Sequence, residues 1–425
     1  MQYAKTVLDN GLKVLTIPMP SVPSATVTVW VKTGSRNEEK KNSGISHFLE
    51  HMGFKGSKKR PTAKEISEVI DAIGGEFNAG TGKEYTNYYV KCRKDDIETA
   101  FDILSDMIIN PILDKSEIER EKGTIIEEIR MYEDTPMMKI GDTFEELIYA
   151  GSTLGWDISG TEASVQGIGY RDFIDYRKKF YTAENMMLTV AGGVSQNIVE
   201  KLAKKYFDNF QLPISNLQSI FNKSISKQTK PQIKLHNKKK EQAHVILGFL
   251  ADGKNYKGKY AQSILAAILG GGMSSRMFIE VRERRGLAYA IRTSMDRYSD
   301  IGYIGTYAGL DVKKAEEAVA VMLEQHYKIR NSRFQILDSE LKKAKEFLKG
   351  HLALALEDTS DVNSFFGDQE LFGEKVLTPE EVFKKIDKVT MDEVNFEAKR
   401  LFVPARLNLA IIGPYKSDKD FQKLL

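Results

Sequence analysis

Two stretches of this chain, roughly 200 residues each, repeat the same order of predicted strands and helices. In the first stretch, a β-branched strand at 27–32 and a second strand at 86–92 precede two helical patterns. These patterns cover 95–109 and 115–133, and the stretch ends on a strand at 187–191. The second stretch repeats this order at 244–250, 303–307, 313–329, 338–355 and 407–415. The sequence therefore predicts a duplicated domain in which strands alternate with amphipathic helices, in an α/β or an α+β fold.

A change in composition separates the two stretches. Residues 211–232 are rich in Ser, Asn, Lys and Gln, include two prolines and show no sustained hydrophobic period. Such a segment is typical of a linker. We therefore expect an N-terminal domain at 1–212, a linker at 213–232 and a C-terminal domain at 233–425.

Composition excludes several classes of protein. The net charge is +3, whereas a nucleic-acid-binding protein concentrates basic residues because its affinity depends on phosphate contacts. Cys92 is the single cysteine in the sequence, so an intrachain disulfide framework is excluded. The apolar runs are much shorter than the roughly 20 residues that span a bilayer, and the first residues lack a signal-peptide pattern. We therefore expect a cytoplasmic protein that binds neither nucleic acid nor membranes.

The segment GISHFLEHMG (44–53) contains a candidate metal motif. His47, Glu50 and His51 share one face of a predicted helix, because about 100° separates successive residues. Two imidazoles at this spacing can hold one zinc ion, and a carboxylate between them can reach a water on the metal. The H-x-x-E-H order is that of the inverted zincins. The alternative is a surface helix in which the histidines recur by chance.

A zinc site with two histidines needs a third protein ligand. The predicted helix at 115–133 offers Glu128 on the flank of its apolar stripe, with Glu121 two turns earlier on the same face. Glu127 points almost opposite the stripe. An exposed acidic helix explains this patterning equally well, so both interpretations stay open at this point. The other histidines have no partner in a ligand pattern; they are His236, His244, His326 and His351.

Further motifs occur nearly end to end, and together they resemble one known family. They are LDNGLKV (8–14), GISHFLEHMGFKG (44–56), GGEFNAGTGKEYTNYYV (74–90), EREKGTIIEEI (119–129), YTAENMMLTVAGGV (181–194) and LGGGMSSRMFIEVRERRGLAY (269–289). The chain resembles the M16 metallopeptidases, the family of pitrilysin, insulysin and mitochondrial processing peptidase. It is most similar to their short two-domain members. The resemblance implies the LuxS/MPP-like metallohydrolase fold, in which each of two duplicated domains is a mostly antiparallel sheet packed with helices.

The resemblance also assigns roles around the metal. His47 and His51 match the family's zinc-binding histidines, and Glu50 matches its general base. Glu128 falls at the family's third ligand, the residue that the helical face had also favoured. Glu121 matches an acidic residue that supports the orientation of a ligand. The implied cofactor is one Zn²⁺ per chain.

Substrate contacts are implied at two further places. Asn78 and Ala79 match an edge-strand segment that pairs with the substrate main chain, a mode of binding that tolerates many sequences. From the residues alone, a turn between a helix and a strand is the simpler interpretation. Arg282 and Tyr289 match a pair that contacts the substrate backbone and helps stabilise the intermediate, for which their donor groups are suited.

These assignments lead us to expect a zinc-dependent endopeptidase that cleaves short or unfolded peptides inside a chamber. Family architecture builds such a chamber from four domains, and this chain supplies two of them. We therefore expect a homodimer, with a related chain as hetero-partner as the alternative. The main alternative to the enzyme is a non-catalytic scaffold or partner subunit of an M16-like complex, as some relatives are.

Overall fold

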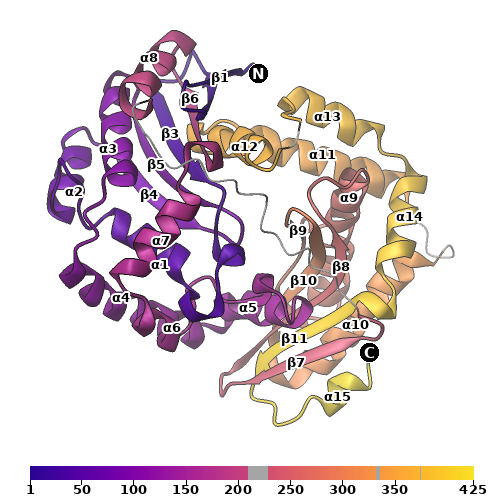
Figure 1. Ribbon diagram of the computed structural model, residues 1–425. Coiled ribbons are helices and arrows are strands. Elements are labelled where there is room, and N and C mark those ends of the chain that lie inside the picture. The colour runs from indigo at the N-terminus through magenta and orange to yellow at the C-terminus, as the bar shows by residue number, and fades with distance from the viewer. Residues whose placement is uncertain (209–227, 332–335, 374) are drawn as a thin grey trace. The chain divides into compact units, whose positions relative to one another are not determined.

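The computed structural model describes residues 1–208, 228–331, 336–373 and 375–425, which divide between two compact units (Figure 1). The described part of unit 1 lies in 1–130, 156–208 and 354–378, and that of unit 2 in 131–155, 228–353 and 379–425. Each unit thus draws residues from both predicted domains. Residues 213–227 of the predicted linker lie outside the described residues. Gln232, the last residue of the predicted linker, is the first residue of a strand.

Unit 1 is built around a six-stranded sheet in the order β1-β2-β6-β3-β5-β4. Its strands are β1 (Ala4–Val7), β2 (Lys13–Pro18), β3 (Ser24–Val31), β4 (Glu76–Thr81), β5 (Thr86–Arg93) and β6 (Met186–Gly192). Strands β2 and β6 pair in parallel, and the other neighbouring pairs of this sheet are antiparallel. Strand β4 lies at one edge of the sheet.

Unit 2 contains a five-stranded sheet in the order β7-β11-β8-β10-β9. Its strands are β7 (Gln232–Asn237), β8 (Gln242–Asp252), β9 (Ala288–Arg297), β10 (Ile301–Asp311) and β11 (Leu407–Gly413). Strands β7 and β11 are parallel, and the other neighbours are antiparallel. Apart from β1, the two sheets have the same strand order and directions. The predicted duplication and the mostly antiparallel sheets are confirmed.

Helices cover these sheets. Those that lie in or begin in unit 1 are α1 (Ile45–Gly53), α2 (Ala63–Ala72), α3 (Ile97–Ile109), α4 (Lys115–Asp134), α6 (Glu162–Gly167), α7 (Tyr170–Phe180), α8 (Gln196–Phe207) and α12 (Thr359–Leu371). Those of unit 2 are α5 (Pro136–Ile148), α9 (Lys259–Gly270), α10 (Ala315–Arg330), α11 (Asp338–Ala355), α13 (Pro379–Lys388), α14 (Met391–Leu401) and α15 (Lys419–Gln422). None of the described helices is both long and apolar enough to cross a membrane.

The two faces of the unit 1 sheet are covered by different parts of the chain. Side chains alternate between faces along a strand, so Val27 and Val29 of β3 enter the main core with α1, α3 and α8. On the opposite face, Trp30 packs against α12, which lies across β3 and β6 (Figure 1). Helix α12 comes from the second half of the sequence, yet it completes the sheet of the first half.

Buried polar groups fix α12 on this sheet. Asn363 is fully buried and donates from Nδ2 to the carbonyl oxygens of Thr26 and Thr189, at 2.8 and 2.9 Å. Thr189 in turn accepts a hydrogen bond from the indole nitrogen of Trp30 at 2.7 Å. Because an unpaired buried polar group costs about 1–3 kcal/mol, this network specifies one position of the helix.

Gly367 of α12 provides a stability test of this interface. A Cβ at Gly367 would lie 2.8 Å from the Trp30 indole ring, so we expect Gly367→Ala to destabilise the protein by about 1–3 kcal/mol. Gly350→Ala in α11 is the matched control, since a Cβ there meets nothing within 4 Å. The control should gain about 0.5–1 kcal/mol from helix propensity. Thermal unfolding of both variants checks the prediction, and an equal rise in Tm would contradict it.

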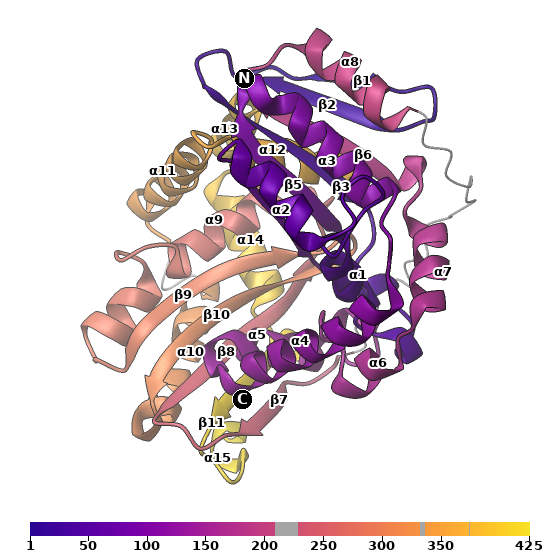
Figure 2. The same cartoon turned by 90° about the vertical axis from the view of Figure 1, so that its left-hand side faces the viewer.

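Unit 2 repeats this arrangement. Helix α5, from the first half of the sequence, packs on β7, β8 and β11, where it forms a core with Ile246 and Ile412 (Figure 2). Phe144 of α5 lies so close to Gly248 that a Cβ there would be 2.6 Å from its ring. Helices α9, α10 and α14 contact the strands as well, and Phe249 packs its ring on Phe402. The two halves of the sequence therefore exchange one helix each.

Candidate metal centre

The helix that carries the H-x-x-E-H motif, α1, begins at a glycine that no other residue could replace without strain. Gly44 has φ +94°, and a Cβ there would lie 2.5 Å from the carbonyl oxygen of Ser159. Gly44 offers no side chain to cap the helix, and Glu38 takes that task. Its carboxylate accepts hydrogen bonds from the backbone N–H groups of Gly44 at 2.7 Å and Ser46 at 2.9 Å. Burial raises the pKa of Glu38 to about 7, although these bonds lower it in part.

Three side chains converge at one point in unit 1. The Nε2 atoms of His47 and His51, both on α1, lie 3.2 Å apart. The Oε2 atom of Glu128, on α4, lies 3.6 Å from His47 Nε2 and 3.4 Å from His51 Nε2. In the described part of the chain, this is the one group of three or more such side chains able to hold a metal ion. The structure thus brings together the three residues predicted as ligands.

These distances fit a zinc ion. In tetrahedral coordination with bonds of about 2.0–2.1 Å, neighbouring ligand atoms lie about 3.3 Å apart, and the three separations span 3.2–3.6 Å. Two neutral imidazole nitrogens and one carboxylate oxygen also form a donor set of the kind found in catalytic zinc sites, which keep a fourth position for water. The residues present therefore fit the metal that the sequence predicts.

The second nitrogen of His51 is held by Glu121. Its Nδ1 lies 2.8 Å from Glu121 Oε1, and Lys55 Nζ donates to Glu121 Oε2 at 2.6 Å. Burial raises the pKa of Glu121, but these two partners outweigh it and hold the pKa below its usual value. The carboxylate therefore accepts from Nδ1–H and leaves the Nε2 lone pair of His51 free for a metal.

Removing this support should weaken metal binding. We expect Glu121→Ala to raise the Kd for zinc by about 10–100-fold, because His51 loses the acceptor that fixes its orientation. Glu119→Ala, on the exposed side of the same helix, is the matched control and should leave the Kd unchanged. Competition with a chromogenic chelator measures both values, and equal Kd values for Glu121→Ala and wild type would exclude this role.

The predicted base, Glu50, lies on the same helix and is held from a different element. Thr81, the last residue of β4, donates from Oγ1 to Glu50 Oε2 at 2.5 Å. Burial raises the pKa of Glu50, and the hydrogen bond from Thr81 offsets this only in part. Such a carboxyl is suited to accept and release a proton near neutral pH.

Asn78 and Ala79 lie in β4, the edge strand beside this base. They pair with Tyr89 and Tyr88 of β5 through one side of the strand. Among the described residues, no strand pairs with the other side of β4. The segment is therefore a strand, and the turn that the residues alone suggested is wrong. An edge strand of this kind can pair with an extended peptide.

Arg282 and Tyr289 lie in unit 2. Arg282 belongs to the π-helical turn Phe278–Glu283, where its guanidinium carbon lies 4.7 Å from the centre of the Phe278 ring. Tyr289 is in β9, with its ring directly over Gly309 of β10. The metal cluster belongs to unit 1, so each set of predicted residues occupies a separate unit.

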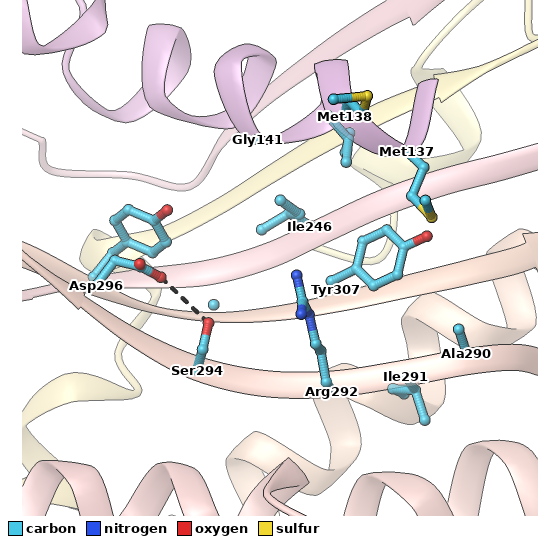
Figure 3. A pocket seen from close by; sticks show the side chains of 13 residues that line it. Met137, Met138, Gly141, Ile246, Ala290, Ile291, Arg292, Ser294, Asp296 and Tyr307 are labelled. Atoms are coloured by element: carbon cyan, nitrogen blue, oxygen red, sulfur yellow. Dashed lines mark hydrogen bonds between the residues drawn. The ribbon is translucent and has the colours of Figure 1, made fainter. Parts of the chain in front are cut away.

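A pocket of about 720 Å³ lies in unit 2 between α5 and strands β9 and β10 (Figure 3). Met137 and Met138 of α5 form its apolar side. Arg292, Ser294 and Asp296, alternate residues of the edge strand β9, form its polar side. Ser294 Oγ donates to Asp296 Oδ2 at 3.2 Å. Flexible apolar side chains opposite a charged strand edge suit an extended polypeptide with mixed side chains.

Comparisons with known proteins identify the family. The family model described as insulinase (peptidase family M16) matches residues 13–162, and that of the peptidase M16 inactive domain matches 167–348. An uncharacterized zinc protease of Mycobacterium leprae is 35% identical over 99% of this chain and 94% of its own length. This chain belongs to peptidase family M16. The uncharacterized zinc protease YmxG of Bacillus subtilis is also 35% identical to this M16 chain, over 96% of it and 97% of YmxG.

Solved structures share the fold of this M16 protein. A protease from Helicobacter pylori is 23% identical, with a TM-score of 0.88 over 97% of this chain and 99% of that chain. A protein of Pseudomonas fluorescens, described as a peptidase M16 inactive domain, is 17% identical, with a TM-score of 0.89 over 98% of this chain and 99% of its own. The predicted fold class and the resemblance to short two-domain M16 members are confirmed.

Three supporting residues of this M16 site were missed from the sequence: Lys55, Glu38 and Thr81. Lys55 follows His51 by four residues, the spacing of helix neighbours, but α1 ends at Gly53 and the sequence does not show that Lys55 reaches Glu121. The sequence contained only a weak indication of Glu38. Gly44 has no side chain to cap α1, so the first N–H groups of the helix require a hydrogen-bond acceptor from another residue. Which acceptor serves is decided by the path of the chain.

Proposed function

We propose that this protein is a zinc-dependent endopeptidase that hydrolyses short or unfolded peptides and holds one Zn²⁺ per chain. One observation carries the proposal: the Nε2 atoms of His47 and His51 and a carboxylate oxygen of Glu128 lie at the separations of a tetrahedral zinc site. The names of full-length relatives as zinc proteases support it. A single buried cysteine, Cys92, is in keeping with a cytoplasmic location.

Each residue around the site has a role in this reaction. His47, His51 and Glu128 would hold the metal, and Glu121 orients His51. When bound, zinc supplies a Lewis acid that polarises the scissile carbonyl and lowers the pKa of a water molecule. Glu50 takes a proton from the attacking water and returns it to the leaving amine, while Thr81 fixes the direction of its carboxylate.

We propose that the substrate is bound at two places, the edge strand β4 and the pair Arg282 and Tyr289. The peptide main chain would pair with the free side of β4 at Asn78 and Ala79, which favours extended or unfolded substrates over folded ones. Arg282 and Tyr289 would donate hydrogen bonds to the substrate backbone and to the developing oxyanion. We further propose that two copies of the chain form a homodimer that encloses a chamber, in which Arg282 and Tyr289 of one copy serve the zinc site of the other.

Zinc content and cleavage of an unstructured peptide library test the enzyme against the scaffold. One zinc per chain and cleavage that stops on chelation are expected for the enzyme. A chain that binds zinc but cleaves no peptide in the library would be the scaffold or partner subunit instead. The scaffold is compatible with two of the comparisons, since the second M16 family model and the Pseudomonas fluorescens structure are both described as an inactive domain.

Mixing two inactive variants tests the shared site. Glu50→Gln lacks the base, and Arg282→Ala lacks the backbone donor, so neither homodimer should cleave peptide. If the site is shared between copies, a mixture of the two should recover activity in heterodimers with one intact pair of residues. A mixture that stays inactive, or a wild-type monomer with full activity in sedimentation, would contradict the homodimer proposal.

A further inference from the structure

Glu38 is a buried carboxylate to which the proposed reaction assigns no task. It is only 6% exposed. Its Oε2 accepts a hydrogen bond from the backbone N–H of Gly44 at 2.7 Å, and its Oε1 accepts from both the N–H and the hydroxyl of Ser46, at 2.9 and 2.6 Å. The first N–H groups of a helix have no acceptor within the helix, and the helix dipole favours a negative charge beside them. Glu38 therefore stabilises the first turn of α1.

This first turn carries part of the candidate metal centre. Ser46 directly precedes His47, and it lies one turn before Glu50 on the same side of the helix. Ser46 Oγ lies 2.8 Å from the hydroxyl of Tyr176, which lies 2.8 Å from Thr33 Oγ1, and all three residues are buried. Because the Ser46 hydroxyl gives its proton to Glu38, Tyr176 donates to Ser46, and Thr33 donates to Tyr176. A chain of three hydroxyl groups thus ends on the Glu38 carboxylate.

The segment that carries Glu38 is itself fixed on the turn that follows β4. The backbone N–H of Arg36 donates to the carbonyl oxygen of Lys83 at 2.8 Å. The Arg36 guanidinium donates to Glu84 Oε1 at 2.5 Å, and both side chains are 2% exposed. Thr81, the partner of the proposed base, lies two residues before Lys83. One short segment therefore holds the start of α1 and the end of β4 together.

We propose that Glu38 is a positioning residue of the metal centre: through the first turn of α1 it sets the places of His47 and of Glu50, the latter relative to Thr81. The inference rests on the proposed function and deepens it. Without the carboxylate, three donors at the start of the helix lose their acceptor, and the first turn shifts or opens. A displacement of about 1 Å in a catalytic arrangement can lower a rate by about 100-fold.

Zinc affinity and the separate changes in kcat and KM test this role. In Glu38→Ala we expect the Kd for zinc to rise by about tenfold, at the lower end of the usual effect of an outer partner. At saturating zinc, kcat for a fluorogenic peptide should fall by about 10–100-fold. KM should stay within about twofold of wild type, because Glu38 bonds to α1 whereas the substrate is proposed to pair with β4. Glu39→Gln changes the adjacent residue, whose side chain is 63% exposed, and should leave all three values unchanged.

Glu38→Gln grades the effect. Its Oε1 can keep both bonds from Ser46, but its amide nitrogen replaces the acceptor of the Gly44 N–H, so its Kd and kcat should lie between those of wild type and Glu38→Ala. A merely structural role would lower the Tm of the metal-free variants and leave the Kd and kcat of the folded protein unchanged, which would overturn the proposal. If Glu38→Ala does not fold, Glu38→Gln decides, and wild-type values of its Kd and kcat would overturn the proposal. A wild-type chain that binds no zinc or cleaves no peptide would overturn the proposed function, and this inference with it.

Discussion

Glu50→Gln should lower kcat/KM for peptide cleavage by about 10²–10⁴-fold, the usual contribution of a general acid–base group. The amide keeps the size of the side chain and can still accept the hydrogen bond from Thr81, but it cannot take a proton. Glu50 is not part of the group of three donors, so the variant should still bind one zinc per chain. Cleavage of a fluorogenic peptide and zinc content, measured on the same preparation, check both parts.

A matched variant separates loss of the base from loss of charge. Glu68→Gln removes a carboxylate from the exposed side of α2, where Glu68 pairs with Lys64, and should leave cleavage unchanged. Cleavage by Glu50→Gln within tenfold of wild type would rule out the role of general base. Loss of zinc from Glu50→Gln would instead make Glu50 a ligand.

Glu128→Gln should remove zinc from the protein. The amide replaces a charged oxygen ligand by a weak neutral one, and we expect the Kd to rise by more than about 100-fold, beyond the usual effect of an outer partner. Glu127→Gln is a sharp control because it changes the adjacent residue of the same helix. The Glu127 side chain is 72% exposed and pairs with Arg130 at 2.6 Å, so its replacement should leave zinc binding unchanged.

Chelator competition on the two variants measures this difference, and peptide cleavage should follow zinc content. Equal Kd values for Glu128→Gln and Glu127→Gln would show that Glu128 is not a ligand. Cleavage by a zinc-free Glu128→Gln would go further and show that the metal has no part in the reaction.

The helical period was sufficient to choose between these two glutamates. It placed Glu128 at the flank of the apolar stripe of its helix and Glu127 on the solvent side, and the structure has them so. The same reasoning placed His47, Glu50 and His51 on one face. Regular spacing within one helix is a local property, so the sequence determines which side chains point the same way.

Elements that depend on pairing were harder to predict. The segment at 76–81 contains Asn, Gly and Ala, residues of low strand propensity, and local patterning favoured a turn. Its pairing with β5 makes it a strand instead. The pattern at 115–133 predicted the end of α4 to within one residue, but it did not indicate that a further helix, α5, opens at Pro136.

By itself, the sequence determined the duplicated order of elements, the M16 family and the face of α1 that carries the metal motif. Tertiary structure decided which distant groups complete the support of that face: Lys55 on the Glu121 that holds His51, Thr81 beside Glu50, and Glu38 at the start of the helix. It also decided that α5 and α12 cover the sheets of the opposite halves. The physical reason is that helical period and turn chemistry act over a few residues, whereas burial and hydrogen bonding join residues far apart in the chain.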